Sequence, residues 1–406
     1  MRNKKMNILV LLTALLIMIF VTGCGDSKTA EVKEYAKTID ELTIPEGTEI
    51  VAFGEATHGN SDFQELKTEI FKKLVESGEV KSFCLEGHSG CYLTVNDYIN
   101  GGETTLDEAM DALNFRIYKT ETCEELLKWM REYNLEQGAG NRLNFYGYDM
   151  QDDEPYIDYL TKKAGIDGSM FDKVSIDDVS LTLNEKLDKI GLIRAELEKM
   201  ADDPSIDYEE ATHMLRCLEQ CVILFDAYVN NAGESYKLRD GYMAENVEWI
   251  LEREQELGRN MIFVTGHAGH ISKLPQSPMY QNNNMGCLLE SEHPTGYYVI
   301  GSDFYRTTAN LPNSKGERGK HSFKSDDGFA KSAKDFGGRY LLQFDDVDTA
   351  STLYAELGED VSMGSLGESY SVLMHIIKRT HIVNAAPLDC YDAMVFVYDA
   401  EPLKLK

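Results

Sequence analysis

The feature that most constrains the fold of this chain is an alternation of short apolar runs with amphipathic segments. Segments such as 62–78 and 122–138 place apolar residues at the spacing of one helix face. Strands that alternate with helices build a mostly parallel sheet covered by helices on both faces. The sequence therefore predicts an α/β fold with a mostly parallel central sheet flanked by helices. The expected strands are 49–54, 81–86, 143–148, 260–266, 297–303, 339–344 and 393–398.

Two stretches depart from this alternation. Residues 155–257 contain long amphipathic runs and few strand-like ones, which predicts a helical insertion between the third and fourth strands. We therefore expect an α/β catalytic domain formed by 43–154 and 258–406. Residues 305–337 are rich in Gly, Ser, Lys and Asp, and this composition predicts a mobile loop over the site.

The N-terminal residues read as a targeting segment. A basic start, MRNKK, precedes the apolar run ILVLLTALLIMIF, which is shorter than the ~20 residues of a spanning helix. The following VTGC resembles a bacterial lipobox. This resemblance implies a lipoprotein signal peptide at 1–23, lipidation of Cys24 and a polar tether at 24–42. We expect an extracytoplasmic protein held at the cell membrane by its lipid, and the alternative is an uncleaved N-terminal anchor.

Charge and cysteine content narrow the classes of partner. The chain has 69 acidic and 40 basic residues, a formal charge of −29, which disfavours nucleic acid and anionic lipid headgroups as partners. If Cys24 is lipidated, an odd number of the eight cysteines remains. There is no C-x-x-C pair. Cys217 and Cys221 share a helix face, which fits a metal or redox pair but better fits buried thiols.

Polar residues follow four of the predicted strands at the point where each strand ends. In an open α/β sheet, ligands bind outside the carboxyl ends of the strands. We therefore expect these side chains to meet at one rim and to form an active site, although an aspartate in such a place also serves as a helix cap. The residues are Glu55 and His58, Glu86, Asp149, and His267 with His270.

These same positions carry a resemblance to a known family. The motifs GEATHG at 54–59, LEG at 85–87, NFYGYDM at 144–150 and GHAGHI at 266–271, with LLKWMREYN between them, resemble the erythromycin esterase family. The resemblance covers roughly residues 45–305. It implies hydrolysis of an ester or macrolactone by directly activated water.

The resemblance also assigns expected roles. His58 matches the general base, and Glu55, Glu86 and His267 match the polar cleft of the family. Lys67 stands where the family can carry an arginine. Arg116 lies where many members have a tryptophan-containing stretch. We expect Lys67 and Arg116, together with Asp149 and His270, to contact the substrate.

These residue types are suited to ester hydrolysis, whether or not the resemblance holds. Imidazole is the side chain whose pKa suits a base near neutral pH. Glu55 or Glu86 could orient the His58 ring, and His267, Lys67 or Arg116 could stabilise the oxyanion.

The sequence also allows other catalytic groups and other functions. Ser89 in GHSGC follows a strand, but Cys91 replaces the last glycine of a nucleophile elbow. The acidic and histidine side chains could bind zinc or iron, but no H-E-x-x-H occurs, so we expect no metal and no cofactor. The alternatives to a hydrolase of small esters or macrolides are a haem- or iron-binding lipoprotein of related α/β fold and a metal-dependent cell-envelope ester hydrolase.

Overall fold

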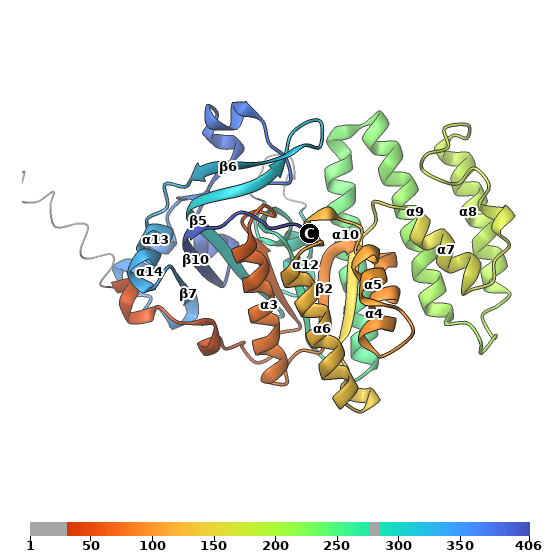
Figure 1. Ribbon diagram of the computed structural model, residues 1–406, viewed down its shortest axis with the longest axis horizontal. Coiled ribbons are helices and arrows are strands. Elements are labelled where there is room, and N and C mark those ends of the chain that lie inside the picture. Colours follow the sequence, from red (N-terminus) through yellow and green to blue (C-terminus); the bar gives the residue numbers. More distant parts are fainter. Residues whose placement is uncertain (1–30, 276–283) are drawn as a thin grey trace, which may run out of the picture.

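A computed structural model describes residues 31–275 and 284–406 and shows a central sheet with helices packed around it (Figure 1). In these residues the sheet has eight strands in the order β3-β2-β4-β1-β5-β10-β7, with β6 paired to β5. The pairs β5–β6 and β10–β7 are antiparallel, and the other strand pairs of this sheet are parallel. The predicted mostly parallel α/β fold is confirmed, and every predicted run forms a strand. The strands are β1 (Ile50–Glu55), β2 (Ser82–His88), β3 (Asn144–Asp149), β4 (Ile262–His267), β5 (Tyr297–Pro312), β6 (Arg318–Lys324), β7 (Arg339–Gln343) and β10 (Ala393–Ala400).

The path of the chain through the sheet decides where the helices lie. The chain moves from β1 to β2 and β3, returns to β4 between β2 and β1, and then crosses to β5 on the far side of β1. Right-handed crossovers place helices on opposite faces when this direction reverses. Accordingly α3 (Ser61–Glu76) packs beside α6 (Glu121–Glu136), as Figure 1 shows, and α10 (Ala232–Glu256) packs against α12 (Met285–Glu292). Shorter α-helices are α4 (Tyr92–Ile99), α5 (Leu106–Ala112), α11 (Ala268–Ile271), α13 (Gly328–Ser332), α14 (Thr352–Leu357) and α15 (Pro387–Cys390).

The predicted helical insertion is present between β3 and β4. It consists of α7 (Glu154–Lys162), α8 (Leu183–Glu198), α9 (Tyr208–Asn230) and α10. Figure 1 shows α7, α8 and α9 away from the sheet, whereas α10 packs on β3 and β4. Cys217 and Cys221 are buried in α9 as free thiols, in agreement with the structural reading of this pair.

The prediction of a mobile loop at 305–337 is wrong. β5 continues to Pro312 and forms a hairpin with β6, and α13 follows. Alternate residues of the hairpin, including Ala309, Leu311 and Phe323, are buried, so the polar residues between them form its exposed face. The Asn313 side chain closes the turn by accepting hydrogen bonds from the backbone N–H groups of Lys315 and Glu317. Turn chemistry and alternation together explain why a polar composition builds strands here.

The targeting segment and Cys24 lie outside the described residues. Between residues 31 and 275 and between 284 and 406, none of the helices combines the length and the apolar character that crossing a bilayer requires.

A bulge in β2 sets the direction of the Glu86 side chain. The pairing of β2 with β3 shifts register between Leu85 and His88. Bulges of this kind redirect a side chain at the end of a strand. Gly147 of β3 faces the bulge, and a Cβ atom there would lie 2.3 Å from the carbonyl oxygen of His88. The bulged backbone therefore requires a residue without a side chain at position 147.

We expect Gly147→Ala to lower the free energy of unfolding by about 1–3 kcal/mol, because backbone atoms that cannot move independently surround the new methyl group. Urea denaturation followed by circular dichroism measures this change. Gly191→Ala in α8 is the matched control, since no atom lies within 4 Å of its added Cβ. The control should be stabilising by about 0.5–1 kcal/mol. An unchanged midpoint for Gly147→Ala would mean that the bulge is not fixed by this contact.

Candidate active site

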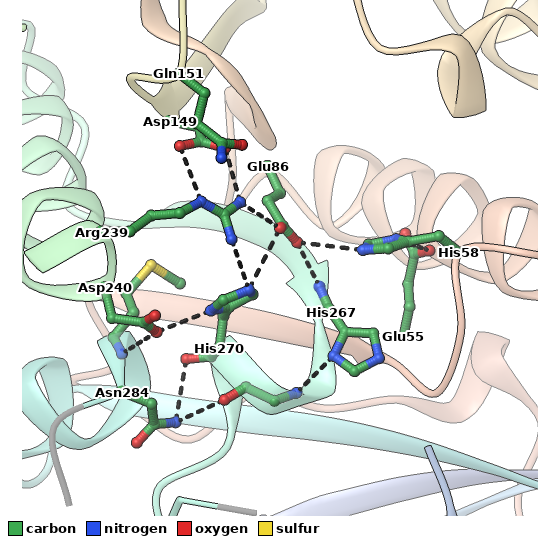
Figure 2. Close-up of polar contacts among 12 residues, drawn as sticks. Glu55, His58, Glu86, Asp149, Gln151, Arg239, Asp240, His267, His270 and Asn284 are labelled. Carbon is green, nitrogen blue, oxygen red and sulfur yellow. Dashed lines mark hydrogen bonds and ion pairs between the residues drawn. The ribbon is translucent and has the colours of Figure 1, made fainter. Parts of the chain in front are cut away.

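Four neighbouring strands bring polar side chains to one rim of the sheet. β3, β2, β4 and β1 are adjacent in that order, and they end at Asp149, near Glu86, at His267 and at Glu55 respectively. His58 follows β1, and His270 lies in α11 directly after β4. Figure 2 shows the side chains converging on Glu86. The predicted rim of acidic and histidine residues is therefore present.

Glu55 connects His58 to a buried lysine. The Nζ atom of Lys67, on α3, lies 2.5 Å from Oε1 of Glu55, and Nδ1 of His58 lies 3.4 Å from Oε2. Burial alone would raise the pKa of Glu55, but Lys67 and His58 outweigh it and the pKa is lowered. For His58, burial lowers the pKa, while Glu55 and Glu86 outweigh burial and raise it. The pair of carboxylates therefore favours the imidazolium form of His58.

Glu86 is the centre of the polar network. One carboxylate oxygen, Oε1, accepts a hydrogen bond from Nη2 of Arg239 at 2.9 Å and lies 3.5 Å from Nε2 of His270. The other, Oε2, accepts the backbone N–H of His267 at 2.7 Å and lies 3.6 Å from Nε2 of His58. Burial opposes ionisation, but His270, His58 and Arg239 hold the pKa of Glu86 well below its usual range. Glu86 is therefore a carboxylate and cannot act as a general acid near neutral pH.

Arg239 of α10 is the cation that holds this side of the site together. Its guanidinium donates to both carboxylate oxygens of Asp149, at 3.2 and 2.7 Å, and to Glu86. Its Nη1 lies 3.1 Å from Nε2 of His270, whose Nδ1 lies 2.8 Å from Oδ1 of Asp240. Burial lowers the pKa of His270, but Asp240 and Glu86 raise it overall.

His267 is a neutral ring with both nitrogens engaged. Its Nδ1 accepts the backbone N–H of Gly269 at 3.1 Å, so Nε2 carries the proton and donates to the carbonyl oxygen of Leu366 at 3.1 Å. Burial, reinforced by His58 and His270, lowers the pKa of His267 to about 3. A ring in this state joins two chain segments and has no nitrogen left to accept a proton from a substrate.

A cavity of about 640 Å³ opens beside the network. Its lining includes His58, Glu86, Tyr118, Arg239 and His270. The lining also includes residues of segment 365–383, which we call the cavity wall. It follows the strand β8 (Val361–Gly364) and runs into β9 (Ile382–Ala385), which pairs with β8.

The cavity wall is fixed to the ends of β1 and β4 through its backbone. The N–H of Leu366 donates to the carbonyl of Ala56 at 2.8 Å, and the Leu366 carbonyl accepts from His267. Farther along, Glu368 lines the cavity and forms an ion pair with Arg318 of β6. The hairpin therefore supports the wall but does not itself line the cavity.

Some predicted residues lie away from the cavity. Lys67 is buried against Glu55 and does not line the cavity; its Nζ atom lies 5.0 Å from the centre of the Tyr118 ring, which does. Asp149 is buried under Arg239, and Arg116 is exposed. Ser89 is buried, and its hydroxyl donates to the Asp149 carbonyl. In the part of the chain that the structure describes, no three His, Cys, Asp or Glu residues are arranged to hold a metal ion.

Sequence reasoning missed Arg239 and Asp240 because they lie in a helix and not at the end of a strand. The sequence feature that could have indicated them is an Arg-Asp pair within an amphipathic helix of the insertion. Sequence reasoning also missed the cavity wall, whose His381 borders the cavity.

Comparison with known proteins places this site in a family. The family model for erythromycin esterase matches residues 75–400, which is more than half of the chain. The chain belongs to the erythromycin esterase family. The match includes Glu86, Asp149, Arg239, His267 and the cavity wall, and it begins after His58.

Relatives of the family are distant in sequence. The protein YbfO of Bacillus subtilis (strain 168) is 25% identical over 297 residues, covering 64% of this chain and 65% of YbfO. Erythromycin esterase type II of Escherichia coli is 24% identical over 296 residues, covering 63% of this chain and 67% of that enzyme. The match thus spans about two thirds of the length of these relatives. A mutant of the erythromycin esterase EreC in its open conformation shares the fold, with a TM-score of 0.61, 16% identity, and coverage of 90% of this chain and 97% of EreC.

The contacts of His58 give a prediction for its titration. Because Glu55 and Glu86 raise the pKa of His58, we expect it to titrate above the usual value of about 6.5. Glu55→Gln removes one carboxylate and should lower this pKa. Titration of the ring signals by NMR measures both values.

The exposed Glu76→Gln on α3 is the control and should leave the pKa of His58 unchanged. A His58 pKa at or below the usual value in the wild-type chain would contradict the ion pairs assigned to its ring.

Proposed function

We propose that this member of the erythromycin esterase family is a carboxylic ester hydrolase in which His58 activates water. The observation that carries the proposal is that the His58 ring lies between the carboxylates of Glu55 and Glu86 and borders the cavity. Ester hydrolysis needs a base whose conjugate acid forms easily near neutral pH, and this environment stabilises an imidazolium. The names of the relatives, a hydrolase and an erythromycin esterase, agree with this reaction class.

In the proposed reaction, neutral His58 accepts a proton from water at Nε2 while the water oxygen attacks the ester carbonyl carbon. The carbonyl electron pair moves to oxygen and gives a tetrahedral oxyanion. When the oxyanion collapses, the alkoxide leaves and takes the proton back from Nε2. The products are a carboxylic acid and an alcohol, with one water consumed. Glu55 stabilises the intermediate imidazolium, in the role that an acidic partner has in a catalytic triad.

The oxyanion requires positive charge on the cavity side of the ester. Arg239 and His270 border the cavity and suit this role. Lys67 and His267 suit it less, because Lys67 does not border the cavity and burial keeps the ring of His267 neutral. We assign Lys67 to positioning Glu55, and His267 to holding the cavity wall.

The substrate we propose is a small-molecule ester, with a macrolide lactone as the named candidate. The cavity volume of about 640 Å³ lies within the range of about 300–1,000 Å³ that small-molecule sites occupy. Its lining combines charged groups with the aromatic rings of Phe115 and Tyr118, which suits a ligand with both polar and apolar parts.

Mass spectrometry of erythromycin and of simple esters tests this function. Incubation with the wild-type chain should add one water to a substrate, and His58→Asn should reduce turnover by at least about a hundredfold, because general base catalysis contributes that much. His293→Asn is the control, since His293 bonds Glu49 and Glu248 outside the cavity lining.

Each outcome of this experiment has a distinct meaning. Hydrolysis of simple esters but not of erythromycin would support the mechanism and exclude the macrolide as the substrate. This result would agree with a cell-envelope ester hydrolase. Full activity of His58→Asn would remove His58 as the base. No hydrolysis of any ester, together with a Soret band in the purified protein, would replace the hydrolase with the haem-binding alternative.

We also propose that the chain is a lipoprotein held at the extracytoplasmic face of the cell membrane through Cys24. The support is the basic start, the apolar run and the VTGC motif. We expect Cys24→Ser, expressed in a bacterial host with lipoprotein processing, to prevent lipidation and to shift the protein from the membrane to the soluble fraction. Immunoblotting of the two fractions measures this shift. Unchanged membrane association of Cys24→Ser would favour an uncleaved N-terminal anchor.

A further inference from the structure

We propose that an exposed apolar tip on the cavity wall docks on a membrane surface that contains anionic lipid. The tip is segment 371–380, which consists largely of two short 3₁₀ turns. Three of its large apolar side chains face solvent, with exposed fractions of 72% for Val372, 56% for Leu373 and 78% for Ile376. Scattered single apolar residues are ordinary on a protein surface, but a cluster in five consecutive residues points to an interaction site.

The exposed apolar side chains of the tip do not serve as cavity lining. Val372, Leu373 and Ile376 are not among the residues that line the cavity. The hairpin holds the tip in this orientation: the N–H of Tyr370 donates to the Pro312 carbonyl at 2.7 Å, and the rings of Tyr370 and His321 stack 3.3 Å apart. Figure 1 shows the β5–β6 hairpin and the blue turns of the tip at the same edge of the molecule.

The charge around the tip is opposite to the charge of the whole chain. The formal charge of the chain is −29, but segments 313–324 and 368–381 carry six basic and two acidic side chains. The basic residues are Lys315, Arg318, Lys320, Lys324, Lys378 and Arg379. Asp326 pairs with Lys378, and Glu368 pairs with Arg318. Basic side chains still outnumber acidic ones around the tip. The repulsion from anionic headgroups expected from total charge therefore does not apply to this edge.

Apolar side chains flanked by basic residues match the chemistry of a lipid interface. The apolar groups enter the boundary between headgroups and acyl chains, and the lysines and arginines meet anionic headgroups. A stable protein interface needs about 20–30 residues on each side, which is far more than three exposed side chains provide. The observations therefore favour a lipid surface over a protein partner.

Docking in this orientation would bring the cavity to the membrane. Arg379 and Thr380 belong to the tip and also border the cavity. If the chain is an ester hydrolase, as proposed above, its substrates include amphipathic esters that partition into the lipid and enter past these residues. This step rests on the proposed function, whereas docking of the tip does not.

A fluorescence experiment on the full chain tests docking. Leu373→Trp and, as matched control, Val179→Trp are reconstituted into vesicles of phosphatidylcholine with phosphatidylglycerol, and also into vesicles with brominated acyl chains. Val179 is 94% exposed and lies in the helical insertion. We expect blue-shifted emission and quenching by bromine for Leu373→Trp only. Equal emission and no quenching for both variants would overturn the proposal.

A second measurement separates docking from catalysis. Leu373→Asp combined with Ile376→Asp should reduce turnover of a vesicle-embedded ester by roughly tenfold or more, because two apolar side chains no longer enter the lipid. Turnover of a water-soluble ester should not change. An equal loss on both esters, or a dimer in solution that the double variant dissociates, would overturn the proposal. If the wild-type chain cleaves neither ester, the proposed function fails and the fluorescence result still decides docking.

Discussion

The structure of this site depends on one buried carboxylate. Glu86 is surrounded by Arg239, His58 and His270 and by the backbone N–H of His267. These partners come from the ends of different strands and from α10, so one side chain joins β1, β2, β4 and the helical insertion. A buried charge that loses a partner costs about 3–5 kcal/mol. The network therefore holds the rim together, and the insertion is part of the site and not an appendage to the fold.

The three histidines at this rim differ because their neighbours differ. His58 and His270 each have carboxylates beside the ring, which raise the pKa of both against the effect of burial. His267 instead meets a carbonyl and an N–H group, and burial keeps it neutral. Similar burial thus yields two rings that can carry a proton and one that serves as a fixed hydrogen-bonding link. The division of roles follows from the acceptors each ring meets.

The sequence predicted the fold and the rim better than the site as a whole. Apolar runs and helical spacing located the strands, and the positions of Glu55, Glu86 and His267 at strand ends follow from the geometry of a parallel sheet. Arg239 could not be found in this way, because its partner Glu86 is 153 residues away and the connection depends on how α10 packs. The β5–β6 hairpin was missed because polar composition concealed its alternation of buried and exposed residues.

The way the cavity wall is attached has a consequence for how the lining of the cavity can change. In the described chain, β8 and β9 pair with each other and not with the central sheet, so insertions between them leave the register of the central strands unchanged. The wall meets those strands through the backbone N–H and carbonyl of Leu366, which every residue type except proline supplies. Side chains of the wall that do not contact the hairpin, unlike Glu368 and Tyr370, can therefore change while this backbone anchor persists. A chain built on this plan can therefore alter the lining of its cavity without altering the polar network around Glu86.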